Sequence, residues 1–114
     1  SAQVVPLSNS NFNTAVDLWF TDQSSAISTY GHIKDWNVST VTSMLNAFKD
    51  RSSFNENISG WDVSNVYNMA GMFNGAKTFN QPIGEWDVSK VRNMAGMFML
   101  SSFNQYIGDW NICE

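Results

Sequence analysis

Few side chains in this sequence could do nucleophilic or metal chemistry. His32 is the single histidine and Cys113 the single cysteine. Catalysis by a Cys–His pair needs the two side chains within hydrogen-bonding reach. His32 flanks the first of four recurring tryptophan units and Cys113 lies on the fourth, so a stack of such units would separate them by three steps, or roughly 14 Å. A zinc site needs three or four nitrogen, sulfur or carboxylate ligands. The sequence therefore predicts no catalytic dyad, no zinc site and no disulfide within the chain.

Acidic side chains flank the recurring tryptophans. They are Asp35, Asp62, Glu85, Asp87 and Asp109. Side chains alternate in an extended segment, so the carboxylates are predicted to point outward on one concave face while each tryptophan points inward. Oxygen ligands of this kind suit Ca²⁺, with Asp62 and Asp87 as the best candidates. The same face could instead bind a basic segment of a partner protein.

Two other interpretations of these carboxylates remain open. Asp62 and Asp87 could accept local hydrogen bonds from the turn that follows each of them, as Asn37 and Asn111 could at the equivalent positions. Two carboxylates about 5 Å apart would also suit a retaining glycosidase. The local role is favoured because asparagine can replace aspartate at this position.

The candidate residues are positioned by an internal repeat. Trp36, Trp61, Trp86 and Trp110 follow one another at intervals of 25, 25 and 24 residues. Each opens a copy of the same unit, and the first three copies continue through a Phe-Asn pair before the next copy begins. A fixed period in this range predicts units that stack on their neighbours.

The spacing within one unit predicts its secondary structure. Ile, Trp, Val and Val recur at offsets of 0, 3, 5 and 8, a spacing typical of leucine-rich repeats. Alternation at Trp61 and Val63 predicts a short strand that pairs in parallel with the next copy. The wider spacing from Val66 to Phe73 predicts a helical turn. The predicted fold is an α/β repeat solenoid, a leucine-rich-repeat-like stack of short parallel strands and helical turns.

The first 31 residues do not share the repeat. Apolar residues at helical spacing predict a helix over residues 11–20. Asp22 could cap a second short helix that ends at Gly31. We interpret residues 1–31 as an N-terminal helical cap on the apolar end of the stack. Residues 32–114 then hold about three and a half repeats, which form one domain with the cap.

Composition narrows the classes of partner. The formal net charge is −4 and charged residues make up 14% of the chain. Binding to nucleic acid needs clustered Lys and Arg, so a nucleic-acid partner is not expected. No apolar run approaches the roughly 20 residues of a membrane span. Docking on anionic lipid is equally disfavoured.

The repeated motif carries a family resemblance. W-[DN]-V-S-x-V-x-x-M-x-x-[MA]-F followed by F-N-x-x-I resembles the bacterial surface-protein repeat of about 26 residues, which is related to BspA-type leucine-rich repeats. The segment SNFNTAVDLWF…YGHIKDW resembles the one that often precedes such arrays. The resemblance implies a leucine-rich-repeat-like solenoid of a cell-surface or secreted protein, associated with adhesion and protein binding. We expect a non-enzymatic, extracellular or cell-surface module without a cofactor, apart from the candidate Ca²⁺ at the carboxylates. A structural spacer, a fragment of a longer array and a carbohydrate-active enzyme are the alternatives.

The fourth copy opens at Trp110 and stops after five residues. Its outer edge, which includes Trp110, Ile112 and Cys113, would leave backbone donors and acceptors unpaired. Either the natural protein continues, or a second copy covers this end as a two-fold homodimer. In the second case Cys113 would lie near the axis and could form an intermolecular disulfide.

Overall fold

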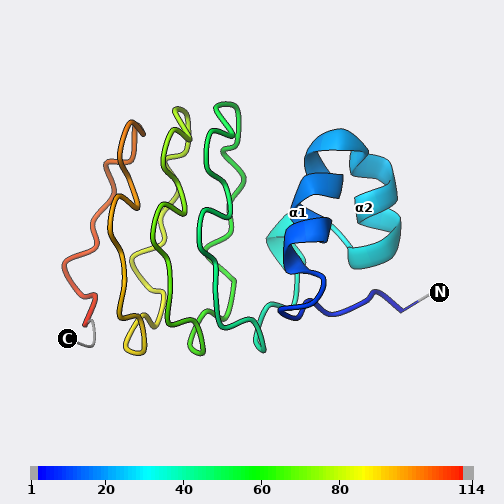
Figure 1. Ribbon diagram of the computed structural model, residues 1–114, viewed down its shortest axis with the longest axis horizontal. Coiled ribbons are helices and arrows are strands. Elements are labelled where there is room, and N and C mark those ends of the chain that lie inside the picture. The colour runs from blue at the N-terminus through cyan, green and yellow to red at the C-terminus, as the bar shows by residue number, and fades with distance from the viewer. Residues whose placement is uncertain (1–2, 112–114) are drawn as a thin grey trace.

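The computed structural model describes residues 3–111. Helix α1 (Phe12–Thr21) and helix α2 (Gln23–Tyr30) form one end, followed by the short 3-10 helix η1 (Ile33–Asp35). The copies of the repeated unit lie side by side beyond them as irregular loops (Figure 1). No helix in the described part of the chain is long and apolar enough to cross a membrane.

Both N-terminal helices form where the sequence predicts them. The apolar face of α1 is buried, including Phe12, Val16 and Trp19. The Asp22 side chain caps α2 by accepting from the backbone N–H of Ser25 at 3.2 Å. These helices cover the first copy through edge-to-face aromatic contacts, with ring centroids 6.2 Å apart for Trp19–Trp36 and 5.8 Å apart for Phe20–Phe54.

The predicted α/β repeat solenoid is wrong. Residues 3–111 contain no β-strand, and the repeated units contain no helix beyond η1. The β-type pairing among them consists of two isolated parallel bridges, Ser43–Asn68 and Asn68–Asn93. The domain is mostly irregular, with two short N-terminal helices and a large buried aromatic cluster.

The segments predicted as helical turns fail to form helices because left-handed residues interrupt them. A right-handed helix cannot continue through a residue with φ near +60°. The backbone instead closes successive tight turns, such as Ala47 N–H to the Met44 carbonyl and Lys49 N–H to the Asn46 carbonyl. Glycine in this segment indicates against a helix, but the prediction gave more weight to the helical spacing of the apolar residues. The left-handed positions are Asn46, Asp50, Gly71, Gly75, Gly96 and Leu100.

The segments predicted as strands keep their alternation but do not pair as strands. Trp61 and Val63 are buried while Asp62 is exposed, as predicted. The nearby backbone groups bond within the copy, for example Trp61 N–H to the Ile58 carbonyl and Val66 N–H to the Val63 carbonyl. Pairing between copies occurs in the segment predicted to be helical, where the Met44 N–H donates to the Asn68 carbonyl at 2.8 Å.

Phenylalanine rings form two stacked columns through the copies. Phe48, Phe73 and Phe98 are separated by 5.7 Å at each step, and their ring planes are nearly parallel. The Phe-Asn phenylalanines form the second column, in which Phe54 and Phe79 are 5.7 Å apart. No polar or charged side chain is buried among the described residues, so this interior is held by apolar burial and ring packing.

The tryptophans form a third column, as the repeat predicts. The indole N–H of Trp61 donates to the Ile33 carbonyl at 2.8 Å, and that of Trp86 donates to the Ile58 carbonyl at 3.2 Å. Trp110 makes the same bond to the Ile83 carbonyl. Each of these indoles therefore ties its own copy to the segment that leads into the preceding tryptophan.

Asparagine side chains link the copies at the surface. The Asn55 carboxamide oxygen accepts the backbone N–H of Asn80 at 2.9 Å, and the Asn80 oxygen accepts that of Asn104 at 2.8 Å. Gln81 and Gln105 donate across the same steps to Asn55 and Asn80. The asparagine of each Phe-Asn pair therefore bonds backbone groups along the stack.

The indole bond yields a stability prediction. Trp61→Phe removes the indole donor to the Ile33 carbonyl at a buried site. The carbonyl keeps its bond from the Trp36 N–H at 3.3 Å, so the change removes one hydrogen bond, which contributes about 0.5–1.5 kcal/mol. We expect urea unfolding to show at least this loss. Trp110→Phe is the matched control, because Trp110 is only half-buried and water can replace its indole. Equal losses in the two variants would contradict the interpretation.

The left-handed positions yield a second stability prediction. Gly75 has φ 76°, and a Cβ there would run into the Asp50 side chain, so Gly75→Ala should destabilise the fold by about 1–2 kcal/mol or more. Leu100, at the equivalent position in the next copy, has φ 57° and is 73% exposed. Leu100→Asn should therefore raise the free energy of unfolding by up to about 1 kcal/mol, because asparagine tolerates this conformation better. Leu45→Asn, at an exposed site without positive φ, should bring no such gain in the same thermal unfolding series.

Candidate functional site

The predicted acidic residues all lie at the surface. Asp35, Asp62, Glu85, Asp87 and Asp109 are exposed, which agrees with the predicted outward orientation. The structure brings them together in pairs: the charge of Asp87 acts on Asp62, and Glu85 and Asp109 line one shallow hollow of about 210 Å³. Nothing in the described contacts gathers all five into one site.

Local hydrogen bonds hold the two central aspartates. Asp62 accepts from the backbone N–H of Ser64 at 3.0 Å and from its hydroxyl at 2.6 Å, both through Oδ1. Asp87 makes the same two contacts with Ser89. The favoured interpretation, a local turn that needs only an Asp or Asn side chain, agrees with this geometry. The equivalent pair in the first copy is Asn37 and Ser39.

These bonds also set the acidity of both carboxyls. The Ser64 hydroxyl, and then its backbone N–H, hold the pKa of Asp62 below its usual value. Ser89 lowers the pKa of Asp87 in the same way. A glycosidase needs one carboxylic acid with a raised pKa to protonate the leaving group. Asp62 and Asp87 are therefore poor candidates for that acid.

The Ca²⁺ hypothesis gains little from the geometry. Residues 3–111 hold no group of three or more His, Cys, Asp or Glu side chains that could bind a metal ion. Ca²⁺ takes six to eight oxygen ligands, and Asp62 and Asp87 each use Oδ1 for a serine. A cation at this pair would have to take most of its ligands from water, so the site stays a prediction.

His32 lies at the junction between the helices and the first copy. Its Nδ1 accepts from the backbone N–H of Lys34 at 3.2 Å, and its ring meets Trp19 edge-on at 5.0 Å. Its Nε2 lies 3.9 Å from the carboxylate of Glu56. These contacts give it a structural role at the junction. Of the predicted dimer end, Ile112 and Cys113 lie outside the described residues. Trp110 is described and is half-buried.

A hollow beside α1 was missed in the sequence. It measures about 310 Å³ and is lined in part by Phe12, Thr42, Leu45 and Tyr67. Leu45 and Tyr67 are each 49% exposed and line the same hollow, so two large apolar side chains are accessible together there. The sequence offered one signal for this hollow, which is variation between the copies. The same position holds Thr42 in the first copy, Tyr67 in the second and Arg92 in the third.

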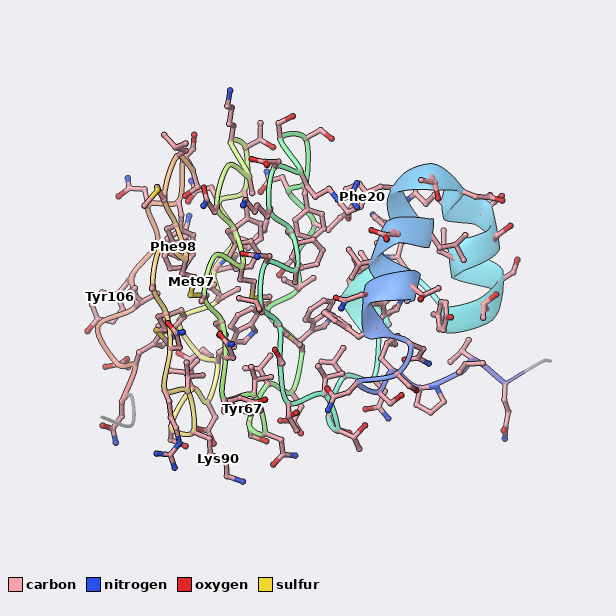
Figure 2. All side chains as sticks on the ribbon, in the orientation of Figure 1. Phe20, Tyr67, Lys90, Met97, Phe98 and Tyr106 are labelled. Atoms are coloured by element: carbon pink, nitrogen blue, oxygen red, sulfur yellow. The ribbon has the colours of Figure 1, made fainter. Side chains whose placement is uncertain are left out.

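Backbone and side-chain bonds make this hollow rigid. Asn9 bonds both the backbone N–H and the hydroxyl of Thr42, at 3.0 and 2.8 Å. The Tyr67 N–H donates to the Thr42 carbonyl, and the Tyr67 carbonyl accepts from the Arg92 N–H, both at 2.8 Å. Tyr67 is therefore held from both sides while its ring stays accessible. Figure 2 shows Tyr67 at the same edge of the molecule as Lys90.

The aspartate–serine bonds predict a particular acid sensitivity. A carboxyl whose pKa is lowered by folding contributes stability above its unfolded pKa of about 4 and loses it as the pH falls through the folded value. The double variant Asp62→Asn/Asp87→Asn should keep the turns, as Asn37 does, and lose part of this pH dependence. Thermal unfolding from pH 7 down to pH 2 should thus show a shallower acid decline than in the unaltered chain. A decline of unchanged steepness would contradict the assignment.

No curated protein and no solved structure matches this chain. A family model described as "Mycoplasma protein of unknown function, DUF285" matches residues 8–114. The match takes in both N-terminal helices as well as the repeated units. Because it covers nearly the whole sequence, the chain belongs to this DUF285 family of Mycoplasma proteins.

Proposed function

We propose that this chain is a non-enzymatic module of a surface or secreted protein that binds a protein or another cell-surface ligand. The hollow beside α1 is the observation that carries the proposal. Its lining combines an accessible aromatic ring, Tyr67, with the exposed Leu45 and polar groups from Asn9 and Asn13. Tyrosine is enriched at protein interfaces, because it offers a large apolar area with a polar tip.

The rigidity of the hollow supports the same proposal. Binding is weakened when loops and side chains must be ordered on contact. Here the backbone of Tyr67 is already bonded to the copies on both sides, and Asn9 fixes the first copy at Thr42. A ligand would therefore meet a surface that changes little on binding.

The repeated motif supports the location. W-[DN]-V-S and the following Phe-Asn pair resemble BspA-type bacterial surface repeats, which favours an extracellular or cell-surface setting. This finer relationship is part of the proposal and does not depend on a leucine-rich-repeat backbone. Asp62 and Asp87 are exposed and ionised at neutral pH, so they would favour a ligand with basic groups near these two carboxylates.

The test replaces the aromatic ring and keeps the backbone. Beads coated with the purified chain would be presented to a panel of extracellular proteins and glycans and to cultured cells. Tyr67→Thr, which installs the residue of the first copy, should weaken binding about tenfold or more. Ile27→Thr, an exposed apolar change on α2, should leave binding unchanged. Absence of binding by the unaltered chain would favour a structural spacer, and equal binding by Tyr67→Thr would remove the hollow from the interface.

A further inference from the structure

The backbone–backbone hydrogen bonds between copies run mainly in one direction. Four backbone N–H groups of the first copy donate to four carbonyls of the second, at 2.7–2.9 Å. The bond that returns is Tyr67 N–H to the Thr42 carbonyl. The second copy repeats the pattern toward the third at 2.8–2.9 Å. The donors are Met44, Asn46, Phe48 and Asp50 in the first copy and Met69, Gly71, Phe73 and Gly75 in the second.

The third copy presents the same donors without acceptors. The backbone N–H groups of Met94, Gly96, Phe98 and Leu100 have no hydrogen-bond acceptor within residues 3–111. The intervening N–H groups are satisfied inside the copy, at 3.0 Å for Ala95, 3.1 Å for Met97 and 3.2 Å for Met99. The left-handed Gly96 and Leu100 match Gly71 and Gly75 of the preceding copy. A row of donors at alternate residues therefore faces outward.

An apolar hollow lies beside this donor row. It measures about 470 Å³ and is lined in part by Met94, Met97, Phe98, Met99, Ile107 and Trp110. Phe98 and Trp110 are half-buried, whereas Phe73 and Trp86, their equivalents one copy back, are buried. Figure 2 shows Met97, Phe98 and Tyr106 at the end of the molecule opposite the helices. We call the donor row of residues 94–100 together with this hollow the C-terminal face.

We propose that the C-terminal face binds a polypeptide segment that carries the pattern of the repeated unit. The segment would lie parallel to residues 94–100 and place its carbonyls at alternate positions against the four free N–H groups. An aromatic side chain of the segment would stack on Phe98, as Phe98 stacks on Phe73 with 5.7 Å between ring centroids. The interaction adds one more layer to an existing ladder, as in peptide recognition by strand addition.

The direction of the ladder disfavours a second folded copy of this chain as the occupant. A two-fold pair would set N–H groups against N–H groups, and those donors would remain unpaired. A head-to-tail pair would need the outer side of the first copy. That side faces α1, because Leu45, Ala47 and Lys49 line one hollow together with Asn13 and Val16. The geometry therefore favours a segment without such a helical cap.

This inference goes beyond the proposed function, because Tyr67 and its hollow are not part of the C-terminal face. The two can fail separately: loss of ligand binding in Tyr67→Thr concerns the hollow beside α1 alone. Binding at the C-terminal face is measured with a different probe and different residues.

The probe is a synthetic peptide with the sequence of residues 61–85, added to the full chain. Amide hydrogen exchange followed by NMR should show new protection at Met94, Gly96, Phe98 and Leu100. The amides of Ala95, Met97 and Met99 are already bonded, so their protection should change far less. A control peptide with alanine in place of Gly71 and Gly75 should bind at least tenfold more weakly, because alanine resists the left-handed conformation of these two residues.

A variant of the chain completes the test. Met99→Lys places in the hollow the residue that the first copy has at the same position, Lys49, so the backbone should tolerate it. It should weaken peptide binding about tenfold or more, while Ile27→Lys on the exposed side of α2 should not. Circular dichroism would confirm that both variants fold. The proposal is overturned by the absence of saturable binding at millimolar peptide, by protection that does not alternate, or by self-association that protects the same four amides without peptide.

Discussion

The stack depends on backbone N–H groups of one copy meeting carbonyl groups of the next in register. Left-handed residues at two places in each copy make this arrangement attainable, because they interrupt the helix and hold alternate N–H groups toward the same neighbour. The phenylalanine columns and the indole bonds follow from it. Rings such as Phe48 and Phe73 can stack at 5.7 Å because the backbone repeats at matching positions.

The same constraint separates structural polar groups from those free to bind. Asp62 and Asp87 are exposed and charged, yet one oxygen of each is used to close its own turn. Asn55 and Asn80 are used in the links between copies. The side chains left over are those that the ladder does not need, such as Tyr67 beside α1 and Met99 at the opposite end. A binding function is therefore expected at positions where the copies differ.

Much of the side-chain arrangement could be predicted from the sequence. The tryptophan column, the asparagine links and the alternation of buried Trp61 and exposed Asp62 all follow from the period and the apolar pattern. The hollow beside α1 could not be predicted, because it forms where α1 meets residues of two different copies. Its position depends on a contact between Asn9 and Thr42 that no local pattern encodes.

The sequence by itself determined that equivalent residues of successive copies lie side by side, because a 25-residue period of apolar residues can be buried only against its own repetition. It also determined the two N-terminal helices, whose apolar spacing and cap residue are local signals. Only the tertiary structure decided the backbone of each copy. Spacing that suits a helical turn also suits successive tight turns, and the choice depends on left-handed residues such as Asn46 and Gly71, whose conformation is stabilised by bonds to the next copy.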